Sequence, residues 1–263
     1  FNFASAGAQT VPAISYGTIT NSGNGNRTLA SSGTIGIAGD FSAGSGSYTV
    51  TGSTVAYNGT GPQSASSLTY ENLTVNNSAG VTLAGASAVN GTLTLTSGAV
   101  TMSSDTLTIG TAGAVTRTAG WVAGPLKKYI PTGTSSRTFE VGDASVYAPV
   151  VVAFTSVTTA GNLAITTTGT DHPDIANSGV SAGLSANRYW TLAPNGIAFG
   201  TYDATFNFDP ADVDVGADPT SFIVDEYTGG AWTLPATGTV TSTSTQATGL
   251  TAFGDFVTGI SAA

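Results

Sequence analysis

The stretch Asn90–Gly110, NGTLTLTSGAVTMSSDTLTIG, decides the fold class. Apolar residues alternate with Thr and Ser along it, which is typical of β-strands that bury one face. Ser-Gly and Ser-Asp turns separate strands of about five residues, which are too short to bury a face alone. One side of these strands holds the apolar residues Leu93, Leu95, Val100, Met102, Leu107 and Ile109. The stretch therefore predicts an all-β chain in which short strands stack on one another.

An internal repeat extends this pattern toward the N-terminus. The segment ISYGTITNSGNGNRTLA from Ile14 aligns with LTYENLTVNNSAGVTLA from Leu68 at an offset of 54 residues. Stacked turns of a parallel β-solenoid bury the inward residues of each turn on the next. The aligned pairs are Tyr16 with Tyr70, Ile19 with Leu73, Leu29 with Leu83 and, after a two-residue slip, Gly39 with Gly91 and Phe41 with Leu93. We expect a β-solenoid-like repeat domain over residues 14–120. An antiparallel sandwich of two hairpin-rich copies stays open, because alternation does not distinguish parallel from antiparallel pairing.

The second half has longer strands that carry aromatic residues at alternate positions. Segments such as VYAPVVVAF, NRYWTLA and TYDATFNF are separated by turn clusters such as PNG and TGG. The charge also shifts, from a net −1 over residues 1–120 to −8 over residues 121–263. We therefore predict a boundary near Gly120 to Gly124 and an antiparallel Ig-like β-sandwich over residues 121–263.

Composition excludes several classes of protein. The 263 residues include 45 Thr, 35 Gly, one His and no Cys, and only 8% are charged. The net charge of −9 repels nucleic acid and anionic lipid. No run approaches the roughly 18 apolar residues of a spanning helix. We expect a soluble chain with no nucleic-acid partner, no membrane insertion and no cofactor.

The same composition predicts the compartment. An acidic, Cys-free and Lys-poor chain fits an exported protein. Phe1 has no basic and apolar leader before it, so we expect a mature chain from which a signal peptide has been removed. The predicted location is secreted, extracellular or at the cell surface.

Three segments carry a family resemblance. YENLTVNNSAGVTLAGASAVNGTLTLTSG, GWVAGPLKKYIPTGTSSRTFEVGD and GLTAFGDFVTG lie within residues 65–259. They resemble, in order, the rungs, the junction and the closing strand of repetitive β-rich cell-surface or extracellular proteins of Bacteroidota and related bacteria. The resemblance implies a role in adhesion, coat or fibre building and no catalytic residues. Those proteins are typically much longer, which suggests that this chain gains size by assembly.

Catalysis is not expected. The single imidazole, His172, sits between Asp171 and Pro173 and is interpreted as a turn residue. Glycan cleavage is the enzymatic alternative, but it needs two carboxylates about 5 to 10 Å apart. Residues 1–120 offer only Asp40, Glu71 and Asp105.

Two further residue sets bear on binding. Asp209, Asp212 and Asp214, followed by Asp218, are calcium candidates because Ca²⁺ prefers closely spaced oxygens, although they lack the order of the known loop motif. A solvated turn is the preferred interpretation. Trp190 and Trp232 occupy alternating strand positions and are expected in the core, whereas exposed aromatics in a shallow cleft would indicate carbohydrate binding.

The N-terminal segment is the candidate for assembly. Residues 1–13 read as an extended apolar-polar segment that could add as a donor strand to a neighbour, with Phe1, Phe3, Val11 and Ile14 as assembly residues. The alternative is that this segment folds on its own domain. We predict a structural subunit of an extracellular filament or surface coat, a homopolymer built head to tail by β-strand addition. A monomeric surface adhesin or carbohydrate-binding module that contacts surface glycans is the alternative function.

Overall fold

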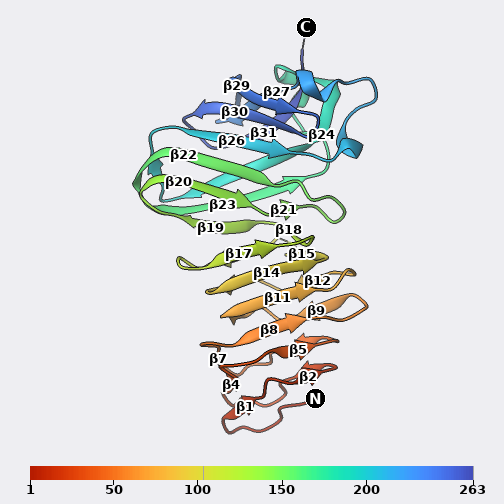
Figure 1. The fold of residues 1–263 in the computed structure, drawn as a ribbon, viewed down its shortest axis with the longest axis vertical. Coiled ribbons are helices and arrows are strands. Elements are labelled where there is room, and N and C mark those ends of the chain that lie inside the picture. The colour runs from red at the N-terminus through yellow and green to blue at the C-terminus, as the bar shows by residue number, and fades with distance from the viewer. Residues whose placement is uncertain (103, 263) are drawn as a thin grey trace. The chain divides into compact units, whose positions relative to one another are not determined.

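The computed structural model describes residues 1–102 and 104–262 and confirms an all-β chain, with 55% of residues in strands and 3% in helices. Two compact units divide the chain, Phe1–Gly124 and Pro125–Ala263. Figure 1 shows the first unit as a stack of coils that runs from red to yellow-green along the chain. No helix among the described residues is long and apolar enough to cross a membrane.

The first unit is a β-solenoid of about seven turns. Within this unit, six turns each contribute one strand to each of three faces. The first face contains β1 (Gln9–Val11), β4 (Arg27–Leu29), β7 (Tyr48–Thr49), β10 (Thr69–Tyr70), β13 (Ser87–Val89) and β16 (Leu107–Ile109). The second face contains β2 (Ser15–Tyr16), β5 (Ile35–Ile37), β8 (Thr54–Tyr57), β11 (Asn72–Asn76), β14 (Thr92–Ser97) and β17 (Ala114–Arg117). The third face contains β3 (Ile19–Thr20), β6 (Phe41–Ser42), β9 (Gln63–Ala65), β12 (Val81–Leu83), β15 (Ala99–Thr101) and β18 (Trp121–Ala123).

Strands of the solenoid pair in parallel with the strands one turn away. Leu73 lies opposite Leu93, and Leu93 opposite Val115, so apolar side chains form inward rows along the stack. Leu73 and Leu93 are fully buried, and each buried side chain of this size contributes about 1.5–3 kcal/mol. The parallel pairing excludes the antiparallel sandwich as the fold of this unit.

The offset of 54 residues is not the period of the solenoid. Tyr16 lies in β2 on the second face, whereas Tyr70 lies in β10 on the first. The offset advances the chain by eight strands, which is not a multiple of the three strands in one turn. True partners lie about 20 residues apart, as Ser15 and Gly36 do. The aligned segments share strand and turn chemistry, and they occupy different faces.

The second unit contains two antiparallel sheets. The first has the order β19 (Leu126–Ile130), β23 (Gly161–Thr168), β24 (Val180–Asn195), β31 (Asp255–Ser261), β27 (Ile223–Thr228), β28 (Ala231–Thr233). The second has the order β20 (Gly133–Phe139), β22 (Val150–Thr159), β26 (Tyr202–Asn207), β30 (Ser244–Leu250), β29 (Ala236–Thr241), and β25 (Ala198–Phe199) also pairs with β22. The remaining elements are β21 (Val141–Gly142) and the short 3₁₀ helices η1 (Ile175–Asn177), η2 (Pro210–Asp212) and η3 (Pro219–Ser221).

Aromatic side chains join these two sheets into one core. Trp190 of the first sheet lies 5.2 Å from Phe206 of the second, measured between ring centroids. Phe206 in turn stacks on Phe256 of the first sheet at 4.8 Å. All three residues are fully buried, and each aromatic pair adds about 0.5–1.5 kcal/mol beyond its buried area. Trp190 therefore belongs to the core, as its place in the strand predicts.

Glu226 is a buried acid in this unit. It is 5% exposed, and its Oε1 has no hydrogen-bond partner among the described residues. Burial raises the pKa of Glu226, and the neighbouring charge of Asp225 raises it further. A carboxyl with a raised native pKa stabilises the fold below its unfolded pKa, and this contribution is lost as the pH rises through the native pKa. At neutral pH the ionised Glu226 therefore lowers stability.

We expect Glu226→Gln to raise the midpoint of thermal unfolding of the second unit at pH 7. The gain shrinks as the pH falls toward about 4.3, the ordinary glutamate pKa, because the wild-type side chain then binds a proton. Calorimetry of both proteins between these pH values measures the difference. Glu71→Gln in the first unit is the control and leaves this transition unchanged. A difference that stays constant across the range contradicts the prediction.

Candidate functional site

The predicted assembly residues divide into two buried and two exposed side chains. Phe3 and Val11 are 4% and 2% exposed, whereas Phe1 and Ile14 are 70% and 54% exposed. Residues 1–13 form the first turn of the solenoid in the monomer, because Asn2 bridges to Thr20 and β1 pairs with β4. Of the two alternatives, donation to a neighbour or folding on its own domain, the monomer therefore adopts the second. The alternate apolar side chains of this segment find partners within the same unit.

Arg27 of β4 holds this first turn in place. The guanidinium is fully buried and has no carboxylate partner within the described residues. Its Nη2 donates to the carbonyl oxygens of Phe3 and Ser5 at 2.9 and 3.0 Å and to Asn21 Oδ1 at 2.6 Å. Its Nη1 donates to the carbonyls of Gly7 and Asn26, at 3.2 Å each. One side chain thus satisfies the backbone of the N-terminal segment as it crosses the end of the stack.

Glycine allows the segment to lie this close. A Cβ at Gly25 would come within 2.2 Å of the Gly7 carbonyl oxygen, and one at Gly23 within 2.3 Å of the Ser5 carbonyl oxygen. These distances are below any real Cβ contact, so no larger residue fits without moving the backbone. Arg27 and these two glycines together fix residues 3–7 over the second turn.

The outer edge of the first turn is only partly covered. Residues 1–3 lie along β3, through the Phe3 N–H to the Thr20 carbonyl at 2.8 Å. Among the described residues, no strand pairs with the outer edges of β1 and β2. In a parallel ladder, successive residues direct their backbone N–H and C=O alternately to one neighbour strand and to the other. Thr10 and Ser15 therefore direct theirs to the outer edge, away from β4 and β5.

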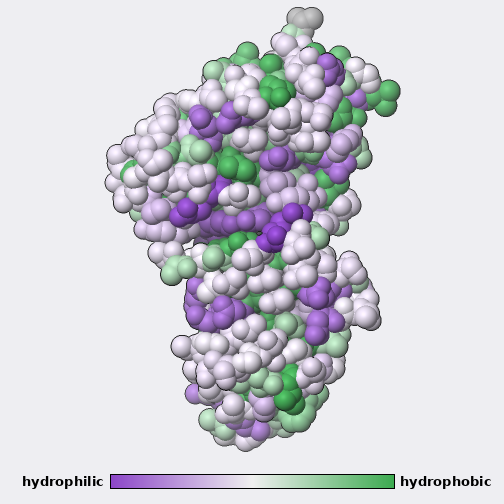
Figure 2. Space-filling view, viewed as in Figure 1, coloured by the Kyte–Doolittle hydropathy of each residue, from purple (hydrophilic) through white to green (hydrophobic). Residues whose placement is uncertain are grey.

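Charge does not protect this edge. Residues 1–26 contain no charged side chain, and the surface of the first turns is mostly pale, of intermediate hydropathy, in Figure 2. Soluble proteins usually block open edges with charge, proline or a cap. No charged side chain therefore blocks the edge of β1 and β2, and Pro12 lies between the two strands.

The second unit has a comparable edge in β29. This strand ends its sheet and pairs only with β30. Its residues are exposed except for the half-buried Val240. No charged residue occurs between positions 231 and 254. Among the described residues, β29 is thus an exposed strand edge without charge, as is the outer edge of β1 and β2.

The calcium candidates do not converge on one point. Asp209 caps η2 by accepting from the Ala211 N–H, and Asp212 pairs with Arg188. Asp214 accepts from the Ser185 N–H at 2.9 Å and from Asn187 Nδ2 at 2.9 Å. Among residues 1–102 and 104–262, no group of three or more His, Cys, Asp or Glu side chains could hold a metal ion. These carboxylates bind protein donors, and Asp212 and Asp214 are half-buried, so the turn is less solvated than the preferred interpretation expects.

Arg188 is the centre of this polar network. Its side chain is fully buried and donates from Nε to Asp212 at 2.9 Å and from Nη2 to Asp143 at 2.7 Å. Its Nη1 also donates to Thr167 Oγ1 at 3.2 Å. Partial burial by itself raises the pKa of Asp143, but hydrogen bonds from Ser145 and Arg188 outweigh it and lower that pKa. The network joins β24 to η2 and to the turn after β21.

His172 lies in a buried aromatic cluster. It is 6% exposed and is surrounded by the rings of Tyr189, Tyr227 and Trp232 at about 5 Å. Its Nδ1 accepts from the Asp174 N–H at 3.1 Å. The neutral ring then carries its proton on Nε2, which donates to Asp255 Oδ2 at 3.2 Å. Both ring nitrogens therefore have protein partners.

Trp232 lies at the border of the core, where it packs against the buried cluster of Ile175, Val180 and Val257. It is half-buried beside His172, and its Nε1 donates to the Asp174 carbonyl at 3.2 Å. No sequence pattern predicts this cluster, because His172 and Trp232 lie 60 residues apart in different segments.

Comparison with protein-family models, with curated proteins and with solved structures gives no match to this chain. The resemblance to bacterial surface proteins therefore stays a prediction. The functional argument rests on the geometry of the two units.

Proposed function

We propose that the protein is a structural subunit of an extracellular filament or surface coat that assembles head to tail by β-strand pairing. The observation that carries the proposal is the open edge of β1 and β2 at the first turn, which is uncharged and has backbone groups directed outward. Pairing of such an edge with another chain supplies main-chain hydrogen bonds. The partner is a second copy of this chain, and the compartment is the cell surface or the medium around a bacterial cell.

The second copy contributes its β29 edge. A contact between two different surfaces of the same chain is heterologous, and it propagates into an open polymer when the rotation does not close. The exposed side chains of Phe1 and Ile14 add apolar area beside the short edges of β1 and β2. Assembly in this form uses the edges of folded strands, and residues 1–13 stay on their own domain.

We also infer that the second unit is an Ig-like β-sandwich that acts as a connecting domain. Two antiparallel sheets with a common aromatic core support this assignment. A crystal structure in which the mean strand directions of the two sheets differ by about 30° supports it, and orthogonal packing contradicts it.

Blocking either edge is expected to stop assembly. Thr10→Lys places a charge beside the open edge of β1, and Thr237→Lys does so at β29; both side chains are exposed. Negative-stain microscopy and sedimentation velocity of the full chain should show fibres for wild type and monomers for each variant. Thr28→Lys is the matched control, because Thr28 is exposed on the same face but its strand is already paired with β1 and β7.

Mixing the two blocked variants gives the sharpest test. Each retains one intact edge, so an equimolar mixture should form dimers and stop there. Wild-type chains that remain dispersed at about 100 μM, well above a micromolar Kd, contradict the proposal. Dispersed particles would favour the monomeric adhesin or carbohydrate-binding module. A mixture that stays monomeric excludes the head-to-tail contact.

A further inference from the structure

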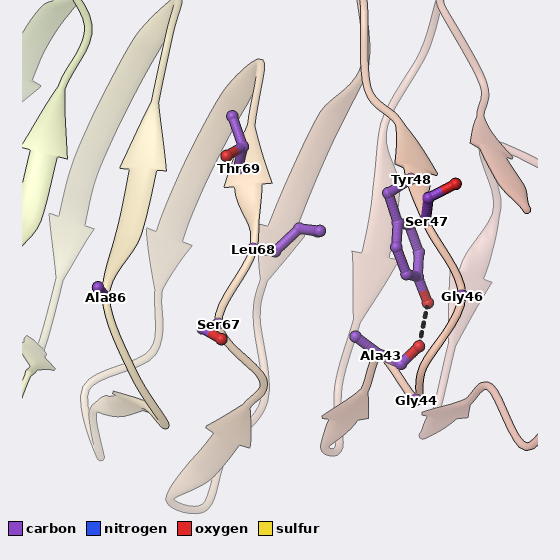
Figure 3. Close-up of a pocket in the computed structure, with 9 residues that line it drawn as sticks. All are labelled: Ala43, Gly44, Gly46, Ser47, Tyr48, Ser67, Leu68, Thr69 and Ala86. Atoms are coloured by element: carbon purple, nitrogen blue, oxygen red, sulfur yellow. Dashed lines mark hydrogen bonds between the residues drawn. The ribbon is translucent and has the colours of Figure 1, made fainter.

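The first face of the solenoid is interrupted between β7 and β10. On that face β4 pairs with β7 and β10 pairs with β13, but β7 and β10 do not pair with each other. The other two faces continue through the same turns, with β8 on β11 and β9 on β12. A cleft of about 430 Å³ lies at the interruption, which Figure 3 shows between the strand of Tyr48 and that of Thr69.

Backbone groups on both sides point into this cleft. The Arg27 N–H donates to the Ser47 carbonyl, so Ser47 and Thr49 face β4 and the N–H and C=O of Tyr48 face the opening. The Ala88 N–H donates to the Leu68 carbonyl, so Leu68 and Tyr70 face β13. The N–H and C=O of Thr69 are then directed toward β7. Two donors and two acceptors therefore line the walls.

The wall formed by residues 43–48 is fixed before any ligand binds. The Tyr48 hydroxyl donates to the Ala43 carbonyl at 2.9 Å and accepts from Asn21 Nδ2 at 3.3 Å. Gly44 has a φ of +65°, and a Cβ there would lie 2.0 Å from the Asn21 carbonyl oxygen. A rigid wall lowers the entropy cost of binding.

The lining is neutral and combines hydroxyls with apolar carbon. No charged side chain lines the cleft. Within the described part of the chain, the hydroxyls of Ser67 and Thr69 make no hydrogen bond to protein. Leu68 and the half-buried ring of Tyr48 supply apolar surface, and Leu68 points toward the strand of Tyr48 in Figure 3.

We propose that this cleft binds one or two units of a neutral sugar chain. A sugar ring has hydroxyls that both donate and accept hydrogen bonds. They match the hydroxyls of Ser67 and Thr69 and the backbone N–H and C=O groups of Tyr48 and Thr69 that face the cleft. Its C–H faces pack on Leu68 and on the edge of Tyr48. The volume falls in the range of about 300–1,000 Å³ typical of small-molecule sites. The absence of charge in the lining disfavours acidic sugars and phosphates.

An extended peptide is the competing ligand, because strand edges flank the cleft. Those edges are only two residues long, Tyr48–Thr49 and Thr69–Tyr70. A peptide strand inserted between them would form few main-chain hydrogen bonds on either side. A compact polyol forms hydrogen bonds to the side-chain hydroxyls of Ser67 and Thr69 as well as to the backbone. The sugar site lies apart from the edges of β1, β2 and β29, so its test is independent of the assembly proposed above.

Saturation-transfer NMR on the full chain tests the proposal with four neutral probes: cellotetraose, xylotetraose, mannotetraose and maltotetraose. Tetragalacturonate is the acidic probe, and a Thr-Ala-Thr-Ala peptide with blocked ends is the extended-chain probe. Ser67→Trp fills the cleft from an exposed position, and Thr69→Val removes one free hydroxyl. Thr28→Val is the matched control, since Thr28 is an exposed threonine of the same face outside the cleft.

At least one neutral probe should bind wild type and Thr28→Val equally. Ser67→Trp should abolish binding, and Thr69→Val should weaken it about fivefold, as expected for one lost hydrogen bond. The proposal is overturned if no neutral probe binds at a probe concentration of about 10 mM, because a site with a millimolar Kd would be mostly occupied at that concentration. It is also overturned if binding survives Ser67→Trp, or if the peptide binds in the cleft and the neutral sugars do not.

Discussion

Arg27→Met is expected to release the first turn of the solenoid and to lower the stability of the first unit by about 3 kcal/mol or more. The substitution removes every donor that Arg27 gives to the carbonyls of Phe3, Ser5 and Gly7. The Phe3 carbonyl keeps the Gly23 N–H as a donor, whereas the part-buried Ser5 and Gly7 carbonyls lose the guanidinium, and a buried carbonyl left without a partner costs about 1–3 kcal/mol. Because no carboxylate pairs with Arg27, the loss comes from these neutral acceptors and not from a broken ion pair.

Hydrogen exchange followed by mass spectrometry measures this effect locally. Peptides that cover residues 1–20 should lose protection in Arg27→Met, while peptides of β14 and of the second unit keep theirs. Arg27→Lys should give an intermediate loss, because one ammonium cannot reach all of these carbonyls. Arg137→Met is the matched control, since the half-buried Arg137 donates only to the adjacent Ser136 carbonyl. Full protection of residues 1–11 in Arg27→Met would refute the anchoring role.

This variant also separates folding from assembly. Arg27→Met should stop assembly by disordering the edge of β1 and β2, whereas Thr10→Lys should stop it with the first turn intact. Hydrogen exchange distinguishes the two causes. Loss of assembly without loss of protection therefore supports edge pairing directly.

Alternation in the sequence predicted the strands, and their short length together with the internal repeat favoured a solenoid over a sandwich, but the period of the solenoid was not predicted. Leu93 and Leu95 alternate with threonines, and both are fully buried in β14. The 54-residue offset does not match the period of the solenoid, because strands of similar composition recur on all three faces. Tyr16 and Tyr70 match in local sequence although they occupy different faces.

The burial of Arg27 and Arg188 was not predicted, although the alternation of buried residues in their strands indicates it. Arg27 lies two residues before the buried Leu29, and Arg188 lies two residues before the buried Trp190. Because alternate residues of a strand point to the same side, both guanidinium groups are expected on the inner side. Charged residues are almost never fully buried without partners, which directs attention away from such positions. The partners of Arg27 are backbone carbonyls brought together only by the fold, so no sequence pattern could name them.

The acid-rich turn shows the opposite case, in which a local signal was available. Asp209 and Asp218 each precede a proline, and Asp at the N-cap with Pro at the first position is typical of a helix start. Both residues cap 3₁₀ helices. Spacing alone suggested a cation site, whereas the Asp-Pro pairs indicated caps. The partner of Asp212, Arg188, lies 24 residues away and could not be assigned from the sequence.

Arg188→Met is expected to lower the stability of the second unit by about 3–5 kcal/mol. Arg188 is fully buried, whereas the Asp143 and Asp212 side chains are 23% and 12% exposed. Removing the guanidinium leaves these two largely buried carboxylates without their cation, and removing one partner of a buried ion pair costs about 3–5 kcal/mol. The three elements that Arg188 joins then lose their common anchor. Urea denaturation followed by tryptophan fluorescence reports on this unit in a Trp121→Phe background, because the other two tryptophans, Trp190 and Trp232, both lie in it.

A compensating variant distinguishes lost pairing from lost packing. Adding Asp143→Asn and Asp212→Asn to Arg188→Met removes both charges that faced the guanidinium, and the triple variant should recover at least half of the lost free energy of unfolding. Replacing a whole buried ion network with neutral groups is often close to neutral, which is the physical reason for the recovery. If the triple variant is as unstable as Arg188→Met, packing of the guanidinium accounts for the loss. If Arg188→Met alone costs less than about 1 kcal/mol, the network behaves like a surface pair and does not anchor the unit.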